Sequence, residues 1–117
     1  MTTISIILRK APYGSVDAPE AVRHALGGIN DDMSVNMILI GSGVNAARRK
    51  QEISGTDYLS VEDGLRDCID MGVALFAENK SLDDEDISET ELIEGVQRAG
   101  FDKIGEVLNA SGTVMIF

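Results

Sequence analysis

The sequence of 117 residues has a single cysteine, a single histidine and no tryptophan. One thiol excludes an internal disulfide and a cysteine-rich metal site, and it fits a reducing compartment, so we expect a cytoplasmic protein without a metal or other cofactor. No apolar run approaches the roughly 20 residues of a membrane-spanning helix. Met1 leads into an apolar strand without a signal-peptide pattern, so we expect no membrane association.

Basic residues are also scarce, with ten Lys and Arg against twenty Asp and Glu and a formal net charge of −10. A chain of this charge repels phosphate backbones, so we expect no direct binding to nucleic acid. The only basic cluster is Arg48-Arg49-Lys50, which we expect on the surface or, in an oligomer, facing a neighbour's acidic segment. That segment, residues 83–94, holds seven acids and is expected to be solvated or to dock a basic partner.

Short apolar runs alternate along the chain with segments of helical periodicity. The pattern predicts strands at 4–8, 35–40, 73–77, 96–99 and 113–117, and helices at 17–29, 44–51, 61–71, 88–95 and 102–110. Asp17, Ser60, Ser88 and Asp102 are the expected helix caps. Strand and helix alternate with short joints, which favours a single α/β domain over residues 1–117. Its architecture would be three-layer α/β/α around a mostly parallel five-stranded sheet.

The expected site is centred on residues 72–82, where a buried strand is followed directly by a polar turn. In a parallel sheet the carboxyl ends of all strands lie along one edge, where ligands usually bind. We expect a small polar pocket at this edge, with Lys80 paired to Glu78; the alternative is a turn that caps the next helix. No dinucleotide or phosphate-loop pattern is complete, so no cofactor is expected. The ligand-binding candidates are Tyr13, Gly14, Ser15, Gly41, Ser42, Gly43, Glu78 and Asn79.

Three short motifs follow one another along the chain in the order found in a known family. They are residues 11–15 before an Ala-rich helix, residues 40–44 at the end of the second strand, and residues 114–117 in the last strand. Together they resemble the DsrE/DsrF family, which includes the sulfur-relay Tus proteins. The resemblance implies a small α/β protein that assembles into dimers, trimers or hexamers. In active members a cysteine just after the third strand carries a persulfide and passes sulfur to a partner protein. Here that position falls at Ala77 or Glu78, so the nucleophile on which sulfurtransferase activity rests is missing.

Cys68, the only thiol, is a weak catalytic candidate. It follows Leu65 by three residues on the apolar face of the 61–71 helix, which is the position of a core residue. It also lies near the carboxyl end of that helix, between Asp67 and Asp70. Burial, the helix dipole and both carboxylates raise the pKa of the thiol, so we expect an inert cysteine.

The sequence therefore favours a DsrE/DsrF-like homo-oligomer that acts as a non-catalytic binding or assembly subunit, with a sulfur-relay protein as a possible partner. One alternative is active sulfur transfer through Cys68, which would then have to be exposed. Another is an enzyme that uses Glu78, in which case a Glu78→Gln variant should lose activity.

Overall fold

A computed structural model describes residues 2–117, so Met1 lies outside it. Five strands form one sheet in the order β4-β3-β2-β1-β5, and every neighbouring pair is parallel. The predicted α/β class and strand count are confirmed, and the sheet is wholly parallel. The strands are β1 (Thr3–Leu8), β2 (Ser34–Leu39), β3 (Ala74–Glu78), β4 (Gln97–Ala99) and β5 (Thr113–Ile116).

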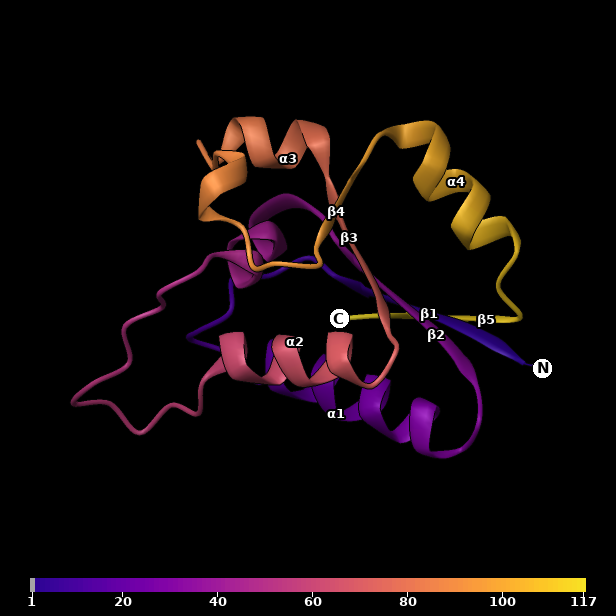
Figure 1. Cartoon of the computed structure of the whole chain (residues 1–117), viewed down its shortest axis with the longest axis horizontal. Coiled ribbons are helices and arrows are strands. Elements are labelled where there is room, and N and C mark those ends of the chain that lie inside the picture. The colour runs from indigo at the N-terminus through magenta and orange to yellow at the C-terminus, as the bar shows by residue number, and fades with distance from the viewer. Residues whose placement is uncertain (1) are drawn as a thin grey trace.

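Helices cover both faces of the sheet (Figure 1). In this view α1 (Asp17–Asn30) and α2 (Val61–Asp70) lie below the strands, and α4 (Phe101–Asn109) lies above them. The short α3 (Asn79–Asp84) continues directly from β3. Crossover helices on the two faces of a parallel sheet give the expected three layers.

The two faces of the sheet differ in how completely they are covered. Residues alternate between faces along a strand, so Ile6 and Leu8 pack in the larger core under α1 and α2, and Ile7 packs in the smaller one with Ile104 of α4. On the α4 face, β5 is left open: Val114 is 41% and Ile116 60% exposed.

Two helix starts differ from the prediction. Asp17 is the first residue of α1 rather than its cap; its backbone N–H is 3.3 Å from the Ser15 hydroxyl oxygen, and its carboxylate pairs with Lys10 at 3.0 Å. Asp102 likewise lies in the first turn of α4, after Gly100. An acidic side chain inside the first turn still stabilises a helix through its dipole, which is why the sequence signal falls so close to the true start.

The segments 44–51 and 88–95 do not form the predicted helices. The 3₁₀ helix η1 (Gly41–Ala47) covers only the first part of the former segment, and the 3₁₀ helix η2 (Glu89–Glu91) lies in the latter and carries the predicted Ser88 capping box. Arg48 is extended and forms an antiparallel bridge with Leu92. The backbone N–H groups of Arg49 and Ile93 donate across this contact, to Glu91 at 2.7 Å and to Ala47 at 2.9 Å. These long-range bonds replace the local bonds that a helix would need.

Candidate functional site

The carboxyl ends of the strands meet at one edge of the sheet, as the sequence predicted. The loop after β1 starts at Arg9, whose backbone N–H donates to the carbonyl of Phe117 at 3.0 Å. The η1 helix follows β2, and α3 follows β3. Most candidate residues therefore share this edge, and the question is what their side chains are free to do.

Ser81 links two of the candidates, Glu78 and Gly41. Its hydroxyl donates to the Glu78 carboxylate at 2.5 Å and accepts the Gly41 backbone N–H at 2.8 Å. Ser81 is buried, so its hydroxyl is held between the end of β3 and the start of η1. The hydrogen bonds make Ser81 a clamp between two loops. Ser81 is not among the residues predicted from sequence, although its distance of three residues from Glu78 fits the first turn of a helix.

The predicted pairing of Lys80 with Glu78 is wrong. The Lys80 amine contacts the Asp84 carboxylate at 2.7 Å instead. Since α3 begins at Asn79, Lys80 and Asp84 lie four residues apart on one helical face. Asn79 is also engaged: its side-chain oxygen accepts from Arg98 of β4 at 3.0 Å.

Tyr13 connects three segments through its hydroxyl. It donates to the side-chain oxygen of Gln51 at 2.5 Å and accepts the backbone N–H of Val61 at 3.2 Å, at the start of α2. Its ring packs against Tyr58 with the centroids 5.2 Å apart. The neighbouring Gly14 has φ of +99°, a conformation that favours glycine. These contacts give the loop after β1 a structural role.

The glycines after β2 allow close backbone packing. A Cβ on Gly43 would lie 2.2 Å from the carbonyl oxygen of Leu8, so only glycine fits where η1 crosses the end of β1. Gly41 has φ of +54° and donates to Ser81. Ser42, between them, is exposed. The structure thus joins Gly41 with Glu78 and gives Gly43 a packing role.

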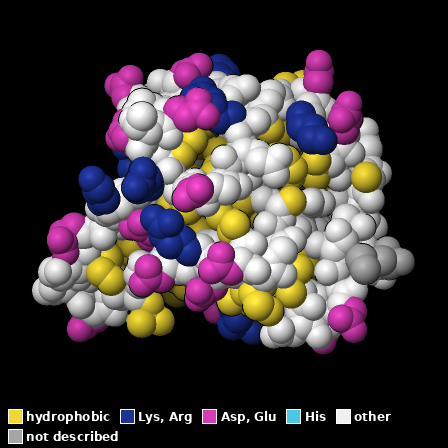
Figure 2. Space-filling view, viewed as in Figure 1, with side chains coloured by type: hydrophobic (Ala, Val, Ile, Leu, Met, Phe, Trp, Pro, Cys, Tyr) yellow, Lys and Arg dark blue, Asp and Glu magenta, His cyan; other side chains and the backbone are white. Residues whose placement is uncertain are grey.

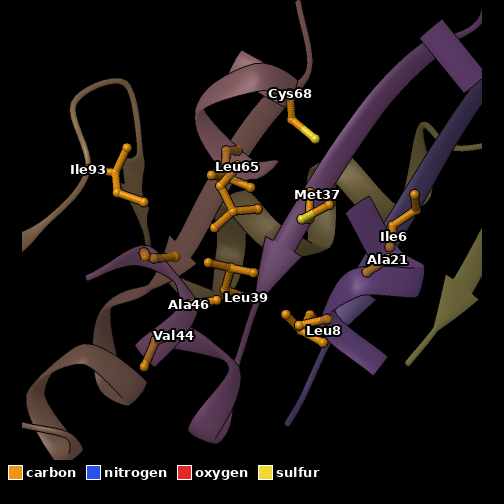
Figure 3. Close-up of a cluster of buried hydrophobic side chains, with 14 of the residues drawn as sticks. Ile6, Leu8, Ala21, Met37, Leu39, Val44, Ala46, Leu65, Cys68 and Ile93 are labelled. Carbon is orange, nitrogen blue, oxygen red and sulfur yellow. The ribbon is translucent and has the colours of Figure 1, made fainter. Parts of the chain in front are cut away.

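Cys68 is fully buried, as predicted, and lies away from this edge on α2. Figure 3 shows its side chain pointing from the helix into the core, on the side of Met37 of β2. Burial, followed by the charge of Asp67, raises the pKa of the thiol to about 11. The predicted direction and both of these causes are confirmed.

Two further sequence expectations concern metals and membranes. Within residues 2–117, His, Cys, Asp and Glu side chains nowhere gather in threes at a spacing suited to a metal ion. In the same part of the chain, each helix is too short or too polar to cross a lipid bilayer.

Comparison with known proteins places this sequence and fold in one family. The DsrE/DsrF-like family model matches residues 3–117. The chain belongs to this family. Protein MJ0989 of Methanocaldococcus jannaschii is 28% identical over 97% of both chains. The crystal structure of the ychN protein from E. coli superposes with a TM-score of 0.91 over the whole of both chains, at 22% identity. Protein MTH1491 from Methanobacterium thermoautotrophicum gives 0.79 at 16% identity over both whole chains.

Replacing Ser81 tests the clamp that joins β3 to η1. A Ser81→Ala variant leaves the Gly41 N–H without its acceptor and the Glu78 carboxylate without the donor of a buried hydroxyl. We expect it to lower the free energy of unfolding by about 1–3 kcal/mol, measured by urea denaturation. The control is Ser42→Ala, which removes an exposed hydroxyl from the same region and should change stability by less than about 0.5 kcal/mol. Equal effects of the two variants would contradict the clamp.

Proposed function

We propose that this chain is a non-catalytic binding or assembly subunit of the DsrE/DsrF-like family. The observation that carries the proposal is the end of β3, where the family resemblance predicts a thiol at Ala77 or Glu78 and neither residue is a cysteine. The Glu78 carboxylate accepts the hydrogen bond from Ser81, and neither group can accept and release sulfane sulfur. Cys68 is buried on another element, which argues against its use as a replacement.

An enzyme built on Glu78 has less support. Ser81 is the hydroxyl in contact with Glu78, and it is also bonded to Gly41. Glu78 is placed to take the Ser81 proton as a base would, but Ser81 is buried and its oxygen already accepts the Gly41 N–H, so it is not presented to a substrate.

Self-association is the second part of the proposal, and the open face of β5 supports it. Val114 and Ile116 point to the α4 side of the sheet, where they are 41% and 60% exposed. On the helix of that face, Phe101 is 84% exposed. β5 is also an edge strand of the sheet. Apolar side chains beside an unpaired strand edge are a surface that a second copy of the chain would cover.

An Ile116→Asp variant tests the assembly. A charge in this apolar face would lose its hydration in an interface, so we expect the mass from light scattering to fall from that of a dimer, trimer or hexamer to one 12.5 kDa chain. Leu59→Asp is the control, because Leu59 is 85% exposed on the loop before α2. Its mass should equal that of the wild type. A wild-type mass of one chain at micromolar concentration would overturn self-association.

A further inference from the structure

The basic cluster Arg48-Arg49-Lys50 lines a cavity that the proposed function does not use. With Thr90 and Glu91 it encloses about 460 Å³ between the end of η1 and η2. Figure 2 shows Lys and Arg side chains gathered on the left of the molecule, where Figure 1 shows the chain leaving η1. This volume is in the range of small-ligand sites, which is about 300–1,000 Å³.

Arg48 is fully engaged within its own chain. Its guanidinium donates to the side-chain oxygen of Asn45, to the Glu91 carboxylate and to the backbone carbonyl of Glu85, each at 2.9 Å. Arg48 therefore meets the acidic segment of its own chain and neutralises the one carboxylate in the cavity wall. Its role is to hold the wall in place.

Arg49 and Lys50 are different, because both side chains are exposed and neither has a carboxylate within 4 Å among residues 2–117. The cavity wall carries three cations and one carboxylate, which leaves two net positive charges. The whole chain carries a net charge of −10, so this cavity is a positively charged region on an acidic protein. Two adjacent cations without an internal partner are suited to an anion from outside.

The backbone that carries these cations is held in place on both sides. The Arg49 N–H donates to the Glu91 carbonyl, and the Gln51 side-chain amide donates to the carbonyls of Ala46 and Arg48. The Gln51 N–H donates to the Glu62 carboxylate at 2.8 Å. A wall fixed in this way loses little conformational entropy when a ligand binds.

Glu62 stays ionised in this position. Burial raises the pKa of its carboxyl, but hydrogen bonds from Arg66 and from the backbone N–H groups of Gln51 and Lys50 outweigh burial and lower it. The Gln51 N–H bond to this carboxylate fixes the backbone directly after Lys50, whose own conformation is unusual.

Lys50 adopts such a conformation, with φ of +61°. Residues other than glycine adopt it infrequently, and in this structure Asp32 and Asp86 do so as well. A glycine would adopt it more readily, yet the chain places a cation at this position.

We propose that this cavity binds a phosphate group, either as inorganic phosphate or as a phosphomonoester, with Arg49 and Lys50 as its cationic ligands. A phosphate dianion matches the two net charges of the wall, and it offers several acceptor oxygens to a guanidinium and an ammonium. The cavity is larger than a phosphate ion, so the organic part of a phosphomonoester has room beside the cations.

Titration of the ¹⁵N-labelled protein with inorganic phosphate at low ionic strength tests the site. We expect saturable chemical-shift changes confined to the amides of residues 47–51 and 89–92. An Arg49→Gln/Lys50→Gln variant should bind about tenfold more weakly or not at all. The matched control is Arg23→Gln/Lys103→Gln, which removes the same charge from exposed positions on α1 and α4 and should bind as the wild type does.

A second titration with glycerol 3-phosphate distinguishes the two sources of the phosphate. Tighter binding than inorganic phosphate indicates a phosphomonoester site, and equal binding indicates a site for the ion alone; both support the proposal. It would be overturned by unsaturable or dispersed shifts, by equal weakening in the control variant, or by binding of an acidic peptide and not of phosphate.

Discussion

Gly43→Ala is expected to lower the free energy of unfolding by ~2–4 kcal/mol. The new methyl group would lie 2.2 Å from the carbonyl oxygen and 2.8 Å from the carbonyl carbon of Leu8. Both atoms belong to the backbone of β1, a central strand whose hydrogen bonds to β2 and β5 hold it in position. A flexible side chain could move aside from such a contact, but this backbone cannot. Either η1 must shift away from the sheet or the end of β1 must distort.

Gly27→Ala provides the matched control. Gly27 lies within α1, and a Cβ there would have nothing within 4 Å. Alanine has the higher helix propensity, so this variant should gain about 0.5–1 kcal/mol. Urea unfolding of both variants measures the difference, provided that the denaturant slopes agree with the wild type. If Gly43→Ala were as stable as the wild type, η1 would not cross β1 as closely as described.

A displaced η1 would also affect the edge of the sheet. Gly41 begins η1 and donates to Ser81, so a shift at Gly43 should break the link to Glu78. The same short helix ends one residue before Arg48, which holds the wall of the basic cavity. We therefore expect Gly43→Ala to disturb both candidate sites, although Gly43 lines neither of them.

The strands could be predicted from sequence because each is a short β-branched or apolar run with a clear end. β1 and β2 are buried on both faces, and only an all-parallel arrangement with helices on each side explains two such runs with short joints. The sequence does not determine the order of the strands, because parallel crossovers of similar length are compatible with several orders.

The segments that sequence reasoning placed wrongly depend on distant contacts. Residues 44–51 have a helical pattern, but Arg48 pairs with Leu92, more than forty residues away, and the local helix is lost. The α3 helix lies in a polar stretch where Leu82 alone marks the buried side. Periodicity cannot reveal a helix of six residues with so few apolar positions.

The same distinction applies to the candidate sites. The common edge of the β1, β2 and β3 loops follows from parallel strands alone, so it could be predicted. The contact of Ser81 with Gly41 requires β2 and β3 to be neighbours, and that follows only from the strand order. Among residues 2–117, Arg49 and Lys50 could be identified as cations without a carboxylate partner only from the structure, which pairs the adjacent Arg48 with Glu91.

Native Cys68 is expected to react with a maleimide at neutral pH at least about 100-fold more slowly than an exposed cysteine. Its pKa of about 11 lies two units above the ordinary 9.0, and each unit lowers the thiolate fraction about tenfold at neutral pH. Full burial adds a steric barrier, because the reagent must wait for α2 to open. Labelling followed by mass spectrometry over time measures the rate.

The control is a Cys68→Ala/Met71→Cys variant, which moves the thiol three residues along the chain to a side chain that is 50% exposed in the wild type. It should label at the rate of a free thiol, as should the wild type in denaturant. Equal rates for native Cys68 and this control would contradict the prediction that Cys68 is inert. Sulfur transfer through Cys68 would then again be a candidate function.

The labelling rate bears directly on function, because a persulfide carrier must present its thiolate to a donor and then its persulfide to an acceptor, which takes the outer sulfur and leaves the thiolate behind. Both encounters are between proteins, and a protein donor needs far more access than a maleimide. If opening of α2 limits labelling, the same opening limits both sulfur transfers. Incubation with a low-molecular-weight persulfide should then add no sulfur to Cys68 but should add sulfur to the Met71→Cys control. With Glu78 at the end of β3 and its only thiol in the core, the chain would then keep the family's fold without its sulfur chemistry.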